Sequence, residues 1–410
     1  MKHGLPLRAA DLRGLGRLGV EAVLQVTDLV EAVHGGIQHV ATLRAPRPGA
    51  RPGHVARFAY GSVRGVTRLV GAALERVATG LDGAANDAAH SAGREAVLAA
   101  LNGVLGDHLE ASGNPFAIPL HLRHGDAVLP LDDRAALRAA LPDAQPRVLV
   151  LLHGLCMSPW QWRMRSARAT PDTDIQALAE SLGYSVLLLH YNSGRHVAHN
   201  GRELAGQLQA LVDAWPRPIS QLTLLGHSMG GLVARSACHA AQDHGHGWVR
   251  LPVSLICLGT PHHGAPLERA GNGVDRLLAA LPLVAPFARL GHLRSAGITD
   301  LRHGAVSEPD VRGPGRFAVC GRPHTVLPLP ETVALHVLAG TRSPSLARSR
   351  LRGDGLVPVA SALGQHRDPE RDLAVPASRK AIIADAGHLA LLHHPEVLSV
   401  LGRWLRRGNG

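Results

Sequence analysis

A serine lies between two glycines in the segment Gly226–Gly230, which reads GHSMG. A serine hydroxyl is a weak nucleophile at neutral pH, so it needs a base to remove its proton and a carboxylate to orient that base. Glycines in this pattern are typical of a strand-to-helix turn that is too tight for side chains beside the serine. The motif therefore makes Ser228 a candidate nucleophile for acyl transfer.

Two downstream segments hold the residues that such a serine requires. Asp354 lies between glycines in GDGLVP. His388 is the last residue of IIADAGH, a segment that begins with an apolar run. The order serine, aspartate, histidine is that of the α/β-hydrolase arrangement. Asp385 is an alternative carboxylate, although Asp354 has the better loop setting. His227 adjoins the serine, but we expect its side chain to leave the turn in another direction.

Acyl transfer passes through an oxyanion, which needs backbone N–H donors. The sequence predicts one donor at Met229, directly after the serine, and a second at Leu155, in the HGL segment that follows an apolar run. His153 begins that segment and resembles a base, but we expect it to support the loop. The side chains expected to contact substrate are those of His153, His227, Leu281 and Phe287.

The segment GTPHHGAP closes another apolar run and contains the paired histidines His262 and His263. Adjacent histidines in a loop without nearby acids at ligand spacing make a poor zinc site. The four cysteines lie far apart and lack any CxxC spacing, so neither a disulfide framework nor a metal site follows from them. We expect a loop at the mouth of a pocket and no metal or other cofactor.

Apolar runs precede these loops and predict the elements that position them. Four of the runs are Arg147–Leu152, Tyr184–His190, Gln221–Leu225 and Pro252–Leu258. Strands this uniformly apolar belong in a sheet that is covered on both faces and is therefore mostly parallel. Helical stretches alternate with them, at Asp174–Leu182, Arg202–Ala214 and Met229–Gln242. This alternation predicts an α/β fold.

Other elements are expected on both sides of this core. Two later strands are predicted at Thr332–Leu338 and Lys380–Ala384, and a hairpin followed by a helix is predicted at Phe116–Arg123, Ala127–Leu131 and Asp132–Leu141. Open α/β sheets build their sites at the carboxyl ends of their strands. Candidate residues that are distant in sequence can therefore meet at one edge of the sheet.

The domain boundaries follow changes in hydrophobic period. We expect a helical extension over residues 1–115 and a catalytic domain over 116–410, with a helical cap inserted at about 265–330. The arginine-bearing apolar stripe at Val63–Val77 suits a lipid surface, but the favoured interpretation is a helix that packs on the main domain. The cap is either a lid that opens at a lipid interface or a fixed cover.

Composition excludes several classes of protein. The 410 residues are 45% hydrophobic and 18% charged, which excludes wholesale disorder. Lys+Arg 43 against Asp+Glu 32 leaves a net charge of +11, but the arginines are scattered, so we do not expect nucleic-acid binding. The start has no apolar stretch followed by a cleavage site, and no run of 18 apolar residues occurs. The expected location is the cytoplasm, with peripheral membrane contact through residues 1–115 as an addition.

Taken together, the segments resemble the bacterial lipase and esterase branch of the α/β-hydrolase fold, and in particular triacylglycerol lipases and GPI inositol-deacylases. LLHGL, GHSMGG, GTPHHGAP, GDGLVP and AGHLALL occur in the family's order and span roughly residues 147–405. The resemblance implies a serine hydrolase of carboxylic esters, from small molecules or lipids. It implies Ser228 as nucleophile, His388 as base and Asp354 as the group that orients it.

Two alternatives to this hypothesis stay open at the level of sequence. The same machinery serves thioesters and amides, because all three reactions are acyl transfers. A non-catalytic scaffold could instead bind lipid or a partner through its N-terminal helices. A site that has lost its catalytic function, however, has no reason to keep the serine, the aspartate and the histidine together. Replacement of Ser228 distinguishes catalysis from binding.

Overall fold

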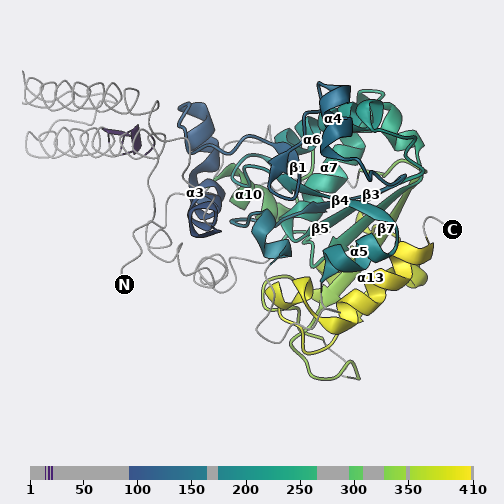
Figure 1. Cartoon of the computed structure of the whole chain (residues 1–410). Helices are drawn as coiled ribbons and strands as arrows, with labels where there is room; N and C mark the ends of the chain where they lie inside the picture. Colours follow the sequence, from purple (N-terminus) through teal and green to yellow (C-terminus); the bar gives the residue numbers. More distant parts are fainter. Residues whose placement is uncertain are drawn as a thin grey trace, which may run out of the picture. The chain divides into compact units, whose positions relative to one another are not determined.

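The computed structural model describes residues 92–163, 174–265, 295–307, 327–347 and 351–407, together with Gly14, Arg17, Leu18, Val20 and Glu21 (Figure 1). The chain divides into two compact units, one of residues 1–91 with 109–117 and one of residues 92–108 with 118–410. Most of the expected extension over 1–115 and of the cap over 265–330 lies outside the described residues. The predicted domain boundaries therefore stay predictions.

The described residues of the second unit form an eight-stranded sheet in the order β2-β1-β4-β3-β5-β6-β7-β8. The strands are β1 (His121–His124), β2 (Ala127–Val128), β3 (Arg147–Leu152), β4 (Tyr184–His190), β5 (Gln221–His227), β6 (Val253–Leu258), β7 (Val333–Gly340) and β8 (Lys380–Ile383). From β4 to β8 all neighbours are parallel, whereas β1 is antiparallel to both β2 and β4. This is the predicted mostly parallel sheet of the α/β-hydrolase fold.

The strands β3 to β7 are buried on both faces, which explains why they are mostly apolar. Along β3, Val148 and Val150 belong to one core cluster, and Leu149 and Leu151 belong to the other. The helices α6 (Val197–Ala214) and α7 (Met229–Asp243) cover the first face, and α5 (Ile175–Ser181) and α13 (Pro395–Arg407) cover the second (Figure 1). Each strand therefore buries consecutive side chains on opposite sides.

Short elements connect this framework. The other α-helices in the described part of the chain are α3 (Ala92–Ala111), α4 (Arg134–Ala140), α10 (Ala296–His303) and α12 (Val359–Ala362). Single 3-10 turns occur at Pro159–Trp162 (η1), Gly247–Arg250 (η3), Pro369–Arg371 (η4), Ala377–Arg379 (η5) and Leu389–Leu392 (η6). Asp133 and Asp174 cap α4 and α5, because each carboxylate accepts hydrogen bonds from two amides of the first turn.

Two predicted elements have different lengths in the structure, and a distant polar group explains each difference. The helix expected to start at Arg202 begins at Val197, whose N–H donates to the Asp300 carboxylate at 2.7 Å. The strand expected from Phe116 begins only at His121. The N–H of Ile118 donates to the side chain of Asn102 at 3.0 Å and not to a neighbouring strand.

Few residues of the first unit are described. Within it, the Asn114 side chain donates to the carbonyl of Gly14 at 3.1 Å, and the Phe116 ring lies so close to Gly14 that a Cβ there would come within 2.7 Å of it. The apolar stripe Val63–Val77 lies outside the described residues. Among the helices that are described, none combines the length and the apolar character that a bilayer crossing requires.

Candidate active site

Ser228 occupies the sharp turn between β5 and α7. Its backbone has φ +54° and ψ −120°, a conformation that residues with a side chain rarely adopt. The Ser228 N–H donates to the carbonyl of Leu258, at the end of β6, at 2.8 Å. Strained backbone that neighbouring strands hold in place is typical of a nucleophile turn.

The glycines around the serine are sterically required. A Cβ at Gly226 would lie 2.3 Å from the backbone nitrogen of Gly231. A Cβ at Gly230 would lie 2.4 Å from the carbonyl oxygen of Leu152. No side chain fits at either place without moving backbone, so the GHSMG pattern follows from the packing of this turn.

Asp354 and His388 form a buried hydrogen-bonded pair. His388 Nδ1 donates to Asp354 Oδ2 at 2.7 Å. The other carboxylate oxygen, Oδ1, accepts from the backbone N–H groups of Leu356 and Val357 at 2.9 and 2.8 Å. Asp354 is fully buried and His388 is 5% exposed. The carboxylate thus fixes the imidazole and leaves its Nε2 atom free for another partner.

The environment keeps the Asp354 carboxylate charged. Burial by itself raises the pKa of Asp354, but the adjacent His388 and the hydrogen bonds from His388, Val357 and Leu356 outweigh it and leave the pKa below its ordinary value. The carboxylate is therefore ionised at neutral pH and can stabilise an imidazolium on His388.

The three candidate residues follow different strands and reach the same edge of the sheet. Ser228 follows β5, Asp354 lies in the loop after β7, and His388 lies after β8. Gly259, after β6, has φ +57°, and a Cβ there would lie 3.1 Å from Asp354 Oδ2 and 3.2 Å from His388 Nδ1. Sequence reasoning did not single out Gly259, although a glycine at the end of a buried strand is a signal of close approach.

His227 connects the serine turn to His388. Its ring lies 4.7 Å from the His388 ring between centroids, and its Nε2 donates to the carbonyl oxygen of His388 at 3.0 Å. Burial, followed by the neighbouring His388, lowers the pKa of His227 to about 3. His227 is therefore neutral, and its side chain holds the backbone of His388 through this hydrogen bond.

Asp385, the alternative carboxylate, occupies a different setting. It is exposed and has φ +49°, and its N–H donates to the carbonyl of Ser343 at 3.0 Å. The Nδ1 atom of His388 is already bonded to Asp354. The structure thus brings Asp354, and not Asp385, to the histidine.

Both expected oxyanion donors border the serine. Met229 directly follows Ser228, and a Cβ at Gly154, the neighbour of Leu155, would lie 3.3 Å from Ser228 Cβ. Neither the Leu155 nor the Met229 backbone N–H donates to any residue that the structure describes. Their role as donors to an oxyanion beside Ser228 stays a prediction.

His153 has the surroundings of a structural residue. Its ring stacks on that of Tyr191 with 4.2 Å between centroids, and the Tyr191 hydroxyl donates to the His153 carbonyl at 2.7 Å. Burial lowers the pKa of His153 to about 4, so its ring is neutral. His153 and His227 are both fully buried, and their direct contact with substrate stays a prediction. The other expected contacts, Leu281 and Phe287, lie outside the described residues.

The GTPHHG loop follows β6 and contains a buried histidine. Nδ1 of His262 accepts a hydrogen bond from Nη1 of Arg235 at 3.3 Å. Burial, with Arg235 and His263 nearby, holds the pKa of His262 well below its ordinary value. Across the described residues, no group of three or more histidine, cysteine, aspartate or glutamate side chains is arranged to hold a metal ion.

The buried neutral histidines predict that acid weakens the fold. The pKa values of His153 and His227 are lowered from 6.5 to about 4 and about 3, so between these values and 6.5 the unfolded chain binds more protons than the folded one. The free energy of unfolding should therefore fall as the pH falls below 6.5, by up to about 2–3 kcal/mol per pH unit for the two together. Urea unfolding at about pH 7.5 and about pH 5 measures this.

A variant isolates the contribution of one of these histidines. His153→Phe keeps a flat ring against Tyr191 but cannot take up a proton, so its stability should depend less steeply on pH than that of the wild type. Equal pH dependence in the two proteins would show that His153 is not a source of the acid sensitivity.

Comparison with known families gives a match for the central part of the chain. Residues 143–284, about a third of the chain, match the family model described as "PGAP1-like alpha/beta domain". The matched segment contains β3 to β6, Ser228 and both expected oxyanion donors. The match agrees with the predicted α/β fold over this segment. No curated protein sequence matches the chain.

Several solved structures are similar to the chain at low sequence identity. The mature lipase of Bacillus licheniformis is 18% identical, with 64% of this chain and 92% of that chain covered and a TM-score of 0.40. An esterase of Pyrococcus furiosus is 17% identical, with 65% and 84% covered and a TM-score of 0.38. An esterase of the bacterial hormone-sensitive lipase family is 18% identical, with 66% and 79% covered and a TM-score of 0.37.

Proposed function

We propose that this protein is a serine hydrolase that cleaves carboxylic esters through an acyl-enzyme. The observation that carries the proposal is the buried Asp354–His388 pair, 2.7 Å between Oδ2 and Nδ1, held beside the strained turn of Ser228. A hydrogen-bonded acid and imidazole next to a serine at a strand-to-helix turn is the arrangement that activates a hydroxyl.

In the first half of the reaction, Ser228 Oγ attacks the ester carbonyl while His388 Nε2 accepts the hydroxyl proton. The carbonyl oxygen becomes negatively charged and accepts hydrogen bonds from the N–H groups of Leu155 and Met229. Asp354 stabilises the imidazolium that forms on His388. The C–O bond to the alcohol then breaks, and His388 returns the proton to the departing oxygen.

In the second half, water takes the place of the alcohol. His388 removes a proton from the water, whose oxygen attacks the acyl carbon and forms a second oxyanion in the same place. Collapse of this intermediate breaks the bond to Ser228 Oγ, and His388 reprotonates the serine. The products are a carboxylic acid and an alcohol, and no cofactor takes part.

The substrate class that we propose is an acyl or lipid ester. It is supported by the resemblance of the motifs to lipases and GPI inositol-deacylases and by the apolar residues expected in the 265–330 cap. Thioesters and amides are alternative substrates for the same groups. A cytoplasmic location, with residues 1–115 in contact with a lipid surface, belongs to the same proposal.

Hydrolysis of p-nitrophenyl esters, from acetate to palmitate, tests this function together with labelling by a fluorophosphonate. We expect wild-type protein to hydrolyse the series, to be labelled on Ser228, and to be most active on long acyl chains. Activity on short chains alone would replace the lipid ester by a small ester. Folded protein with neither hydrolysis nor labelling would overturn the proposed function and leave the scaffold alternative.

A further inference from the structure

Helix α3 precedes the segment that matches the family model, yet its residues 92–108 pack against the loop that carries Leu155. A Cβ at Gly103 would lie 2.1 Å from Cys156 Sγ and 2.8 Å from Cys156 Cα. Cys156 directly follows Leu155, and the side chains of Ala100 and Val104 on α3 belong to the main core cluster. Residues 153–156, which carry Leu155, form the oxyanion loop. The backbone of α3 at Gly103 thus contacts this loop, with no space for a side chain between them.

A second loop, residues 192–194 after β4, lies in the same contact. A Cβ at Gly194 would lie 2.1 Å from the carbonyl oxygen of Asn102 on α3. The side chain of Asn192 donates to the carbonyl of Gly106 at 2.8 Å. Ser193 lies between Asn192 and Gly194, and its hydroxyl accepts a hydrogen bond from the Cys156 N–H at 3.1 Å. Ser193 therefore links the loop that α3 holds to the oxyanion loop.

The conformation of Cys156 requires such support. Its backbone has φ +58°, although a residue with a side chain disfavours positive φ. Strained residues persist only where the surrounding structure over-determines them, and they concentrate at functional sites. The close contact with Gly103 and the hydrogen bond to Ser193 are two interactions that restrain Cys156 in this conformation.

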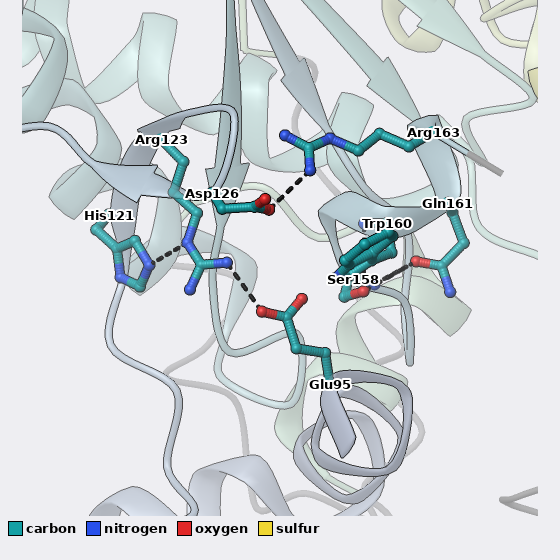
Figure 2. Close-up of polar contacts among 8 residues, drawn as sticks. All are labelled: Glu95, His121, Arg123, Asp126, Ser158, Trp160, Gln161 and Arg163. Carbon is teal, nitrogen blue, oxygen red and sulfur yellow. Dashed lines mark hydrogen bonds and ion pairs between the residues drawn. The ribbon is translucent and has the colours of Figure 1, made fainter. Parts of the chain in front are cut away.

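Two ion pairs link α3 and the β1–β2 hairpin to other parts of the chain (Figure 2). Glu95 on α3 pairs with Arg123 on β1 at 3.0 Å, and both side chains are nearly buried. Arg123 also donates from Nε to Nε2 of His121 at 2.9 Å. Beyond the oxyanion loop, Arg163 pairs with Asp126 in the β1–β2 turn at 2.7 Å. The first pair therefore ties α3 to β1, and the second ties the chain after η1 to the β1–β2 turn.

We propose that α3 is part of the active site's support, and that Gly103 and Ser193 are positioning residues that hold the Leu155 N–H toward the oxyanion. The inference rests on the proposed function, because it assigns a purpose to a donor of that reaction. It makes catalysis depend on residues of a helix that precedes the segment matched by the family model.

The test uses the full-length chain with Gly103→Ala and Ser193→Ala, and Gly206→Ala as the matched control. Gly206 is an exposed helical glycine on α6, and a Cβ there would meet nothing within 4 Å. For each protein we would measure kcat and KM on p-nitrophenyl esters, and both the rate and the final extent of fluorophosphonate labelling. The extent counts folded sites, whereas the rate reports oxyanion stabilisation, because the phosphonyl oxygen occupies the position of the oxyanion.

We expect kcat and the labelling rate to fall about 10-fold or more in Gly103→Ala and about 3- to 10-fold in Ser193→Ala, a part of what full loss of a donor costs. KM should change less than about 2-fold, the labelling extent should be retained, and Gly206→Ala should behave as the wild type. Ser193→Ala removes a single oxygen and decides the test if Gly103→Ala does not fold.

Unchanged rates in folded variants, or a loss of labelling extent alone, would overturn the inference and leave these residues with a role in folding only. A wild-type protein that neither hydrolyses esters nor is labelled would instead remove the proposed function itself. The two failures are therefore distinguishable.

Discussion

Replacing Ser228 by alanine should lower kcat for ester hydrolysis by about 10⁵-fold or more, because loss of the nucleophile removes nearly all the catalysis that such a site provides. The oxyanion donors and the base would remain, but no covalent acyl-enzyme could form. Ester hydrolysis measured at saturating p-nitrophenyl ester, with fluorophosphonate labelling beside it, checks both the rate and the site.

The same substitution should leave the fold nearly unchanged. Alanine keeps the Cβ and adopts the φ of +54° with the same strain as serine, so the backbone conformation stays equally costly. Ser181→Ala, at an exposed position on α5, is the matched control and should have wild-type activity. Substantial hydrolysis by folded Ser228→Ala would show that another group is the nucleophile.

The sheet was predictable from sequence because its physical signal is local. The runs Arg147–Leu152 and Tyr184–His190 coincide with β3 and β4, since strands buried on both faces need apolar residues at every position. The turn around Ser228 was equally readable, because Gly226 and Gly230 sit where no Cβ fits. Such patterns are readable because the residue types themselves stand at fixed places in a short segment of sequence.

Contacts between distant segments were not readable in this way. Two carboxylates, Asp354 and Asp385, were compatible with the loop pattern before His388, and only the fold brings one of them to Nδ1. The support by His227 depends on β5 and the loop after β8 lying side by side. The glycines Gly103 and Gly106 looked like ordinary helix residues, since the loops they contact lie about 50 and 90 residues further on.

Replacing Asp354 by asparagine should lower kcat about 10³- to 10⁴-fold through the wrong tautomer of His388. The Oδ1 atom accepts from the N–H groups of Leu356 and Val357, so an asparagine would keep its oxygen there and present its NH₂ group to the histidine. His388 Nδ1 would then have to accept a hydrogen bond, which puts the proton on Nε2. An Nε2–H cannot take the proton of Ser228. The imidazole of His388 therefore stays in place but no longer acts as a base.

The substitution Asp385→Asn is the matched control, because it makes the same change at the other candidate carboxylate. Asp385 is exposed with φ +49°, a conformation that asparagine tolerates, so this variant should keep wild-type kcat and stability. Rates and urea midpoints of both variants separate catalysis from folding. If Asp385→Asn lost the activity while Asp354→Asn kept it, the pairing of Asp354 with His388 would be structural, and the orienting acid would have to be Asp385.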